Sequence, residues 1–353
     1  MPKFLTVYVG YPREVYRILR VLGKGNIGAT HENNPPIKTE PRTVSPHKRG
    51  KHSIISVHRK NGHPLPVMAA EETWTVNRLL AWTRDFFKKK GIEKPQLEAE
   101  ILLAHAMNTK RIELYTAYET EPTEAQRTLF RDLVKRRGSS EPSAYLTGSR
   151  EFYSLSFKVD RNVLIPRPET EDLVLQTLDT INTYTETAPI IADVGTGSGI
   201  IAITLAKRSP MVRIIAVDLS AEALTVARSN AETHSVSDRI EFRQSDLLEQ
   251  VTETLDIIVS NPPYISQVEF EALPEDVKNF EPQTALLAGT KGTEVVERLI
   301  PQSAARLRSG GHLLLEVSPM IAQSVAELLN GWDNVQILLD SAGRQRIVYG
   351  QKK

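Results

Sequence analysis

The chain has 353 residues, of which 40% are apolar, enough for the hydrophobic cores of more than one domain. It holds no uninterrupted run of about 20 apolar residues and no charged start followed by an apolar segment, so we expect neither a membrane helix nor a secretory signal. It contains no cysteine, which excludes disulfides, thiol catalysis and cysteine-ligated metals and best fits a reducing compartment such as the cytoplasm.

The net charge of +1 averages two unlike parts of the chain. Residues 1–67 carry 12 Lys and Arg against 3 acids, a net +9, which leaves 32 basic and 40 acidic residues, a net −8, for residues 68–353. This basic leader is rich in Pro, Asn and Ser and has no apolar period, so we predict that it is disordered. It could be an organelle transit peptide, a nucleic-acid-binding arm, or an incidental extension ahead of a start at Met68, and we favour the last interpretation.

Residues 68–148 predict a small helical domain. The stretch "TVNRLLAWTRDFFKKKG" repeats apolar residues every three or four positions, "QLEAEILLAHAM" gives a second helix, and "TEAQRTLFRDLVKRRG" gives a third with Thr123 as its N-cap and Gly138 beyond its end. Three aromatic residues of the first helix are expected in the core of this domain rather than at a ligand: Trp82, Phe86 and Phe87.

Residues 149–188 predict a hairpin and a linker. Apolar and polar residues alternate along "EFYSLSFKV", and the apolar run "VLI" follows the polar "DRN". This pattern is typical of two antiparallel strands that join the helical domain to the rest of the chain.

From residue 189 to residue 353, short apolar strands alternate with helices. The strands read "IIADVG", "RIIAVDLS", "IEFRQSD", "LDIIVSN", "HLLLEV", "VQILLD" and "RIVYG". This alternation predicts an α/β fold, a seven-stranded and mostly parallel sheet with helices on both faces. The last two strands are joined only by "SAGRQ", so we expect the final strand to run antiparallel. Ligands of such sheets bind outside the carboxyl ends of the strands.

A glycine-rich loop follows the first strand. It reads "DVGTGSG", and its residues are candidates for cofactor binding: Asp193, Gly195, Thr196, Gly197, Ser198 and Gly199. Glycines let the backbone approach a ligand closely at a helix N-terminus. No Lys or Arg stands in this loop, so the pattern carries no requirement for a phosphate.

Two further acids end the second and third strands. Asp218 can accept hydrogen bonds from both hydroxyls of a ribose and would repel a 2′-phosphate, although it could instead cap the helix that begins after Ser220. Asp246 can accept from the amino group of an adenine, on whose ring Leu247 can pack. These strand ends together predict a ligand that contains adenosine.

The fourth strand ends in "SNPPYI". Two adjacent prolines fix two φ angles and remove two N–H donors, so the nearby oxygen acceptors have few internal partners. The motif could be a bare turn that ends a strand. Beside three other polar strand ends, we favour a ligand-binding role.

These residues resemble the class I S-adenosylmethionine-dependent methyltransferases, and among them the N5-glutamine methyltransferases of peptide chain release factors. The "DVGTGSG" loop, "AVDLS", "QSD" and "SNPPYI" follow the order and spacing of that family, and "VLIPRPETE", "FEPQTALLAG", "GGHLLLEV" and "SAGRQRIVYG" are similar to its other stretches. The likeness spans roughly residues 72–350, including a helical domain that helps dock the release factor in the family. Leu247, where some members carry an aromatic residue, and Ser154, where glycine is frequent, depart from the pattern.

The resemblance implies a cofactor, a substrate and a mechanism. S-adenosylmethionine would be bound by the glycine loop and by four residues at the other strand ends: Asp218, Asp246, Leu247 and Asn261. The substrate would be the glutamine of the Gly-Gly-Gln loop of a release factor, held by Asn261, Pro262, Pro263 and Tyr264. For catalysis, the Asn261 side-chain oxygen and the Pro262 carbonyl would accept both amide protons while Tyr264 packs on the amide. We expect a monomer without a metal and without direct contact to nucleic acid.

Two other functions remain as alternatives. Adenine-N6 DNA methyltransferases share the Asn-Pro-Pro-Tyr motif, but they need a basic protein surface to bind DNA, whereas residues 68–353 carry a net charge of −8. A cofactor-binding relic that acts as a protein-interaction module would have degraded strand ends, and all four are intact here.

Several conspicuous residues are left outside the predicted site. His312 is expected at a strand edge, and Glu316 either caps the following helix or lines the crevice. Arg167, Glu169 and Thr170 look like the family's cover over the cofactor, with a capping box from Thr170 as the alternative.

Overall fold

The computed structural model describes residues 73–184 and 188–353. The predictions for the basic leader and for a start at Met68 lie outside these residues. Within them, no helix combines the length and the apolar character that crossing a membrane requires. The same residues bring no three His, Cys, Asp or Glu side chains together in a way that could hold a metal ion.

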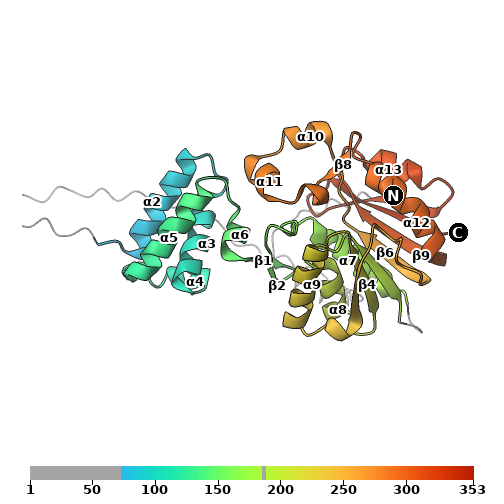
Figure 1. Ribbon diagram of the computed structural model, residues 1–353, viewed down its shortest axis with the longest axis horizontal. Coiled ribbons are helices and arrows are strands. Elements are labelled where there is room, and N and C mark those ends of the chain that lie inside the picture. The colour runs from blue at the N-terminus through green and yellow to red at the C-terminus, as the bar shows by residue number, and fades with distance from the viewer. Residues whose placement is uncertain (1–72, 185–187) are drawn as a thin grey trace, which may run out of the picture. The chain divides into compact units, whose positions relative to one another are not determined.

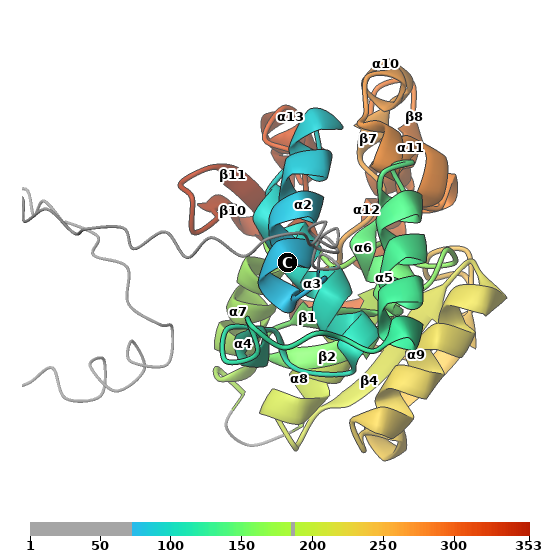
Figure 2. The same cartoon turned by 90° about the vertical axis from the view of Figure 1, so that its left-hand side faces the viewer.

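Residues 73–148 form five helices: α2 (Val76–Lys89), α3 (Pro95–Met107), α4 (Arg111–Leu114), α5 (Glu124–Arg137) and α6 (Ser143–Thr147). Thr123 caps α5 as predicted, because its hydroxyl accepts from the Gln126 amide while the Gln126 side chain accepts from the Thr123 amide. Helix α3 packs against both α2 and α5 (Figure 2). Their shared core contains Leu80, Phe87, Leu103, Phe130 and Val134.

The three aromatic residues of α2 have different surroundings. Phe87 is fully buried, as predicted, and Phe86 is partly buried against the same core. The prediction is wrong for Trp82, which is 52% exposed and stacks on Phe86 with 5.4 Å between ring centroids. Trp82 lies at the margin of the apolar face, where a large ring can cover a neighbour without entering the core.

The predicted hairpin is present, but its turn lies earlier than expected. Strands β1 (Ser149–Phe152) and β2 (Leu155–Lys158) pair antiparallel across Tyr153 and Ser154, whose φ angles are 51° and 61°. Two successive positive φ angles match the twist of a tight hairpin, and glycine adopts such angles with the least strain. The "DRN" segment forms a separate turn, in which the Asp160 carboxylate accepts a backbone amide at 2.9 Å.

The central sheet contains the seven predicted strands: β3 (Ile190–Val194), β4 (Arg213–Asp218), β5 (Ile240–Gln244), β6 (Leu255–Ser260), β9 (Leu307–Glu316), β10 (Asp333–Leu339) and β11 (Gln345–Gln351). Their order is β10-β11-β9-β6-β3-β4-β5. Neighbouring strands from β9 to β5 run parallel, and β11 is antiparallel to both β9 and β10. The predicted mixed sheet with an antiparallel final strand is therefore confirmed.

Helices cover both faces of this sheet (Figure 1). One face carries α7 (Thr170–Ile181), α8 (Ile200–Arg208) and α9 (Ala221–Thr233), and the other carries α12 (Glu294–Arg306) and α13 (Ala322–Leu328). A short 3-10 turn, η1 (Ser237–Arg239), precedes β5. Successive strand residues enter opposite cores, as Ile191 and Ala192 do, because side chains alternate along a strand.

His312 does not lie at a sheet edge, contrary to the prediction. Its strand, β9, has β6 on one side and β11 on the other. The imidazole is half-buried, and its Nδ1 lies 2.7 Å from the Tyr349 hydroxyl on β11. Burial lowers the pKa of His312 below its usual value.

Residues 265–289 form a segment that the sequence did not predict: β7 (Ile265–Ser266), α10 (Gln267–Glu271), α11 (Glu275–Phe280), η2 (Gln283–Ala285) and β8 (Leu287–Gly289). Strands β7 and β8 pair parallel, and the Ile265 amide donates to the Leu286 carbonyl at 3.0 Å. This pairing closes the base of the segment directly after the Asn-Pro-Pro-Tyr motif.

Candidate active site

The carboxyl ends of five strands meet at one edge of the sheet. Val194 of β3 pairs with Val217 of β4 on one side and with Ser260 of β6 on the other, and Ser260 pairs with Leu315 of β9. The polar residues at or beyond these strand ends therefore share this edge. They are the glycine loop, Asp218, Asp246, Asn261 and Glu316.

Asp193 holds the glycine loop through hydrogen bonds. Its Oδ2 accepts hydrogen bonds from the Thr196 hydroxyl at 2.7 Å and from the Ala202 amide at 3.1 Å. The amides of Gly195 and Thr196 both donate to the Val217 carbonyl at 2.9 Å. The Asp193 side chain is fully buried, and its Oδ1 has no hydrogen-bond partner among the described residues. Burial raises the pKa of Asp193 to about 7, against the opposing effect of its hydrogen bonds.

Gly195, Gly197 and Gly199 have positive φ angles of 73°, 55° and 84°. Two of them leave space beside the loop, and the third is required by packing. A Cβ built on Gly195 or Gly197 would meet no atom within 4 Å, so there is space for a ligand beside the loop. A Cβ on Gly199 would lie 2.8 Å from the Ile203 side chain, so this glycine is required by packing around α8. The Ser198 carbonyl accepts from a side-chain amide of α9 at 2.9 Å, which fixes the loop on that side.

Asp218 ties the loop to the end of β4. Its Oδ2 accepts from the Gly197 amide at 2.8 Å, and its Oδ1 accepts from the Ser220 amide at 2.9 Å. The N-cap of α9 is Ser220, whose hydroxyl accepts from the Ala223 amide at 3.0 Å, so the capping alternative for Asp218 is wrong. Burial raises the pKa of Asp218, and the backbone amides of Ser220 and Gly197 oppose that rise.

Asp246 has a basic partner that the sequence did not indicate. Its Oδ2 forms an ion pair with Arg298 of α12 at 2.6 Å, and its side chain is 38% exposed. Leu247 follows with a φ of 50° and lies partly buried against the α12 and α13 side of the sheet. An adenine amine would have to share the Asp246 carboxylate with Arg298.

The Asn-Pro-Pro-Tyr motif leaves β6 with its acceptors uncovered. The Asn261 Nδ2 donates to the Thr170 hydroxyl at 3.1 Å, while neither the Asn261 Oδ1 nor the Pro262 carbonyl accepts a hydrogen bond from any described residue. Pro262 is buried, whereas Pro263 and Tyr264 are partly exposed. Burial raises the pKa of Tyr264 to about 12, with the Glu316 carboxylate adding to that effect.

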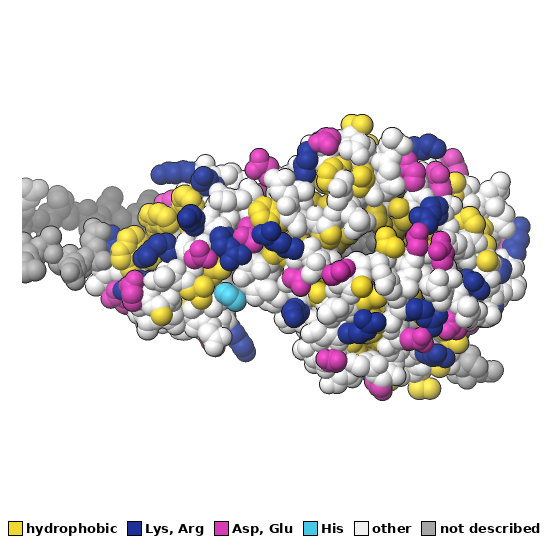
Figure 3. Space-filling view, viewed as in Figure 1, with side chains coloured by type: hydrophobic (Ala, Val, Ile, Leu, Met, Phe, Trp, Pro, Cys, Tyr) yellow, Lys and Arg dark blue, Asp and Glu magenta, His cyan; other side chains and the backbone are white. Residues whose placement is uncertain are grey.

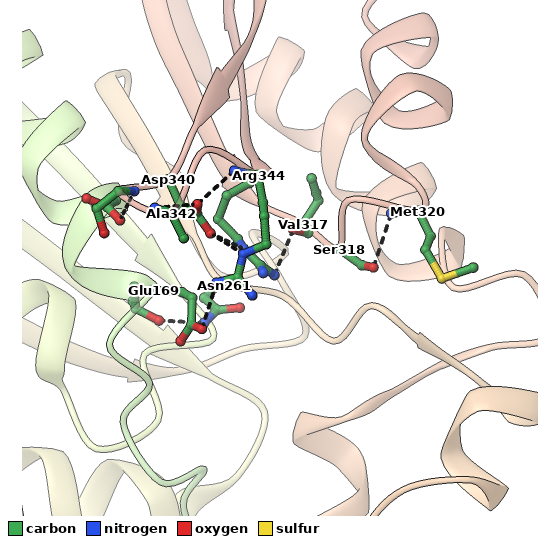
Figure 4. Close-up of polar contacts among 12 residues, drawn as sticks. Glu169, Asn261, Val317, Ser318, Met320, Asp340, Ala342 and Arg344 are labelled. Carbon is green, nitrogen blue, oxygen red and sulfur yellow. Dashed lines mark hydrogen bonds and ion pairs between the residues drawn. The ribbon is translucent and has the colours of Figure 1, made fainter. Parts of the chain in front are cut away.

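Several conspicuous residues outside the predicted site are connected here by hydrogen bonds and ion pairs. Glu281, from "FEPQTALLAG", is buried, accepts from the Ile165 amide at 3.0 Å and pairs with Arg167 at 2.5 Å. Arg344 pairs with Glu169 at 3.1 Å, and Figure 4 shows this pair beside Asn261. The similar stretches outside the four strand ends were the signal for these contacts, although no single residue in them pointed to a partner.

Glu316 lies at the carboxyl end of β9 and does not cap a helix. It ends β9 with 1% exposure, and α13 begins only at Ala322. Neither oxygen of its carboxyl has a partner in hydrogen-bond geometry among the described residues. Burial raises the pKa of Glu316 to about 7, and the Thr170 hydroxyl and the Arg346 guanidinium lower it in part.

A mixed seven-stranded sheet with a glycine loop after β3, acids after β4 and β5, and Asn-Pro-Pro-Tyr after β6 defines a class I S-adenosylmethionine-dependent methyltransferase. The model of the PrmC N-terminal domain matches residues 78–148, and that of the methyltransferase small domain matches residues 170–275.

Three relatives carry the name release factor glutamine methyltransferase. That of Rhodopirellula baltica is 50% identical over 286 residues, which cover 79% of this chain and 97% of the relative. Those of Koribacter versatilis and Chlorobaculum tepidum are each 41% identical, over 73% and 77% of this chain and 91% and 96% of their own lengths. The chain belongs to the release factor glutamine methyltransferase family, and its methyl donor is S-adenosylmethionine.

Proposed function

We propose that this protein transfers a methyl group from S-adenosylmethionine to the side-chain amide nitrogen of the glutamine in the Gly-Gly-Gln loop of a peptide chain release factor. The observation that carries this proposal is the hydrogen bonding of the Asn261 side-chain amide. Its Nδ2 is held by Thr170, while its Oδ1 and the neighbouring Pro262 carbonyl are uncovered acceptors. Two adjacent acceptors match the two N–H donors of a primary amide.

The described residues fit the proposed cofactor. The open space beside Gly195 and Gly197 admits a ligand against the loop backbone, and the Asp218 carboxyl suits two vicinal hydroxyls of a ribose. Asp246 and Leu247 would receive the adenine. When bound, the cofactor supplies an electrophilic methyl group on a sulfonium.

The protein would act mainly by position and polarity. An amide nitrogen is a weak nucleophile because its lone pair is delocalised into the carbonyl. Asn261 and Pro262 would hold both of its protons, and Tyr264, with Pro263 beside it, would pack on the amide plane, so that the nitrogen faces the methyl. As the methyl leaves the sulfonium, whose sulfur keeps the electron pair of the broken bond, the amide nitrogen would become acidic and would release one proton to solvent.

The remaining parts of the chain have proposed roles as well. Residues 68–148 would dock the release factor, and residues 189–353 would bind the cofactor. Residues 149–188 would join these two domains. We propose a monomer that works in the cytoplasm, which light scattering and fractionation can test, with organelle import through the basic leader as the alternative location.

Mass spectrometry of an intact release factor after incubation with isotopically labelled S-adenosylmethionine tests the function. We expect label on the glutamine of the Gly-Gly-Gln loop and none when that glutamine is replaced by glutamate, because an oxygen acceptor would then face two acceptors. Asn261→Ala should lower turnover by at least about a hundredfold while cofactor affinity is kept. Asn261→Asp is a sharper variant, because it keeps an acceptor oxygen but adds a negative charge beside the sulfonium.

Duplex DNA in the same assay tests the adenine-N6 alternative. On the face shown in Figure 3, basic and acidic side chains are interspersed, in keeping with the net −8 of residues 68–353. DNA binding needs a basic surface, so we expect no labelled adenine. Preferential labelling of DNA, or near-normal release-factor methylation by Asn261→Ala, would overturn the proposed function.

A further inference from the structure

Thr170 contacts the central residue of the site from a position that excludes solvent. It is the first residue of α7, its side chain is fully buried, and its Oγ1 accepts from the Asn261 Nδ2 at 3.1 Å. A hydroxyl has one hydrogen and two lone pairs. Thr170 could therefore hold either end of the Asn261 amide, the nitrogen through a lone pair or the oxygen through its hydrogen.

The structure has the nitrogen at this contact. The Asn261 Nδ2 donates to the Thr170 Oγ1, and no described residue donates to the Asn261 Oδ1. In this orientation the oxygen is the end of the amide that is left for a ligand.

We propose that Thr170 is a positioning residue for methyl transfer, whose hydroxyl holds the Nδ2 end of Asn261 so that Oδ1 faces the acceptor amide. The proposal rests on the proposed function and deepens it. Thr170 acts through Asn261 and does not touch the substrate. An inverted Asn261 would turn its own N–H groups toward the N–H groups of the substrate, donor against donor, and would not hold the glutamine.

The test compares Thr170→Val and Thr170→Ser with a matched control on the same helix. Thr177 is equally buried in α7, but its hydroxyl donates to the Leu173 carbonyl, so Thr177→Val removes a buried hydroxyl away from the site. We measure kcat, KM and cofactor affinity with the full chain and an intact release factor. Thr170→Val should lower kcat by about ten- to a hundredfold with cofactor affinity kept within about twofold.

Thr170→Ser should stay within about threefold of the wild type, because it keeps the hydroxyl. A near-normal kcat for Thr170→Val, an equal loss in Thr177→Val, or a loss of cofactor affinity in place of kcat would each refute the proposal. An inactive wild type would instead count against the proposed function.

Hydrogen exchange tests the positioning independently of activity and of the substrate. The side-chain NH₂ signals of Asn261, assigned by their disappearance in Asn261→Ala, should exchange with solvent at least about tenfold more slowly in the wild type than in Thr170→Val. Unprotected Asn261 signals in the wild type would overturn the proposal even if the enzyme is active.

Discussion

Replacement of Asp218 by alanine should separate cofactor binding from helix capping. The Asp218 carboxylate accepts two backbone amides, from Gly197 at 2.8 Å and Ser220 at 2.9 Å, and its remaining lone pairs are available to a ribose. A hydrogen bond to a charged acceptor contributes about 1.5 to 3 kcal/mol, so Asp218→Ala should weaken S-adenosylmethionine binding by about ten- to 150-fold. The unpaired Gly197 amide should also loosen the loop and lower the melting temperature.

The control for this prediction is Ser220→Ala. Ser220 caps α9 through the Ala223 amide at 3.0 Å, so its loss should cost about 1 kcal/mol of stability, a shift of roughly 2–4 °C, without a matching loss of affinity. Isothermal titration calorimetry measures the affinities of the wild type and of both variants. An unchanged dissociation constant in folded Asp218→Ala, or an equal loss in Ser220→Ala, would refute the ribose assignment.

Three further predictions concern the loop, the buried acid and the leader. Gly197→Ala should mainly weaken cofactor binding, because its Cβ enters the open space beside the loop. Gly199→Ala should mainly lower the melting temperature, because its Cβ would lie 2.8 Å from the Ile203 side chain. Equal losses of stability in both variants with unchanged cofactor affinity would contradict this prediction. Since burial raises the pKa of Glu316 to about 7 from 4.5, the folded state without cofactor binds this proton more tightly than the unfolded state. The stability that this proton contributes should be complete below about pH 4.5 and lost as the pH rises through 7. The free energy of unfolding, measured with denaturant from pH 4.5 to 8, should therefore fall less with pH in Glu316→Gln than in the wild type. An equal fall in both proteins would contradict the prediction. A chain that starts at Met68 should keep both its melting temperature and its release-factor methylation, and a loss of activity would instead indicate a substrate-binding or nucleic-acid-binding arm.

The sequence predicted the parts of this molecule that depend on local pattern. Short apolar runs, a glycine-rich loop and polar residues at strand ends are visible in a short window of sequence, which is why all seven strands and the position of Asp218 could be predicted. The hairpin turn was misplaced because Tyr153 and Ser154 adopt positive φ angles without the glycine that usually signals them.

Contacts between distant segments could not be predicted in this way. The Asn261–Thr170 hydrogen bond joins residues 91 positions apart, and the Ile165–Glu281 hydrogen bond joins residues 116 positions apart. Such pairs depend on how loops from different strands meet at one edge, and no period or spacing encodes that meeting. The same limit explains why the Arg298 partner of Asp246 was missed, since α12 follows β5 only after the whole 265–289 segment.

The place of β11 in the sheet has a consequence for biosynthesis. Strands β9 and β10 leave the ribosome before β11, yet β11 lies between them and pairs with both. Until residues 345–351 emerge, β9 presents an unpaired edge next to the site, and exposed edges of this kind invite association with other chains. A nascent chain that stalls before Gln345 should therefore need a chaperone to protect this edge, and its truncated product should be a substrate for proteolysis.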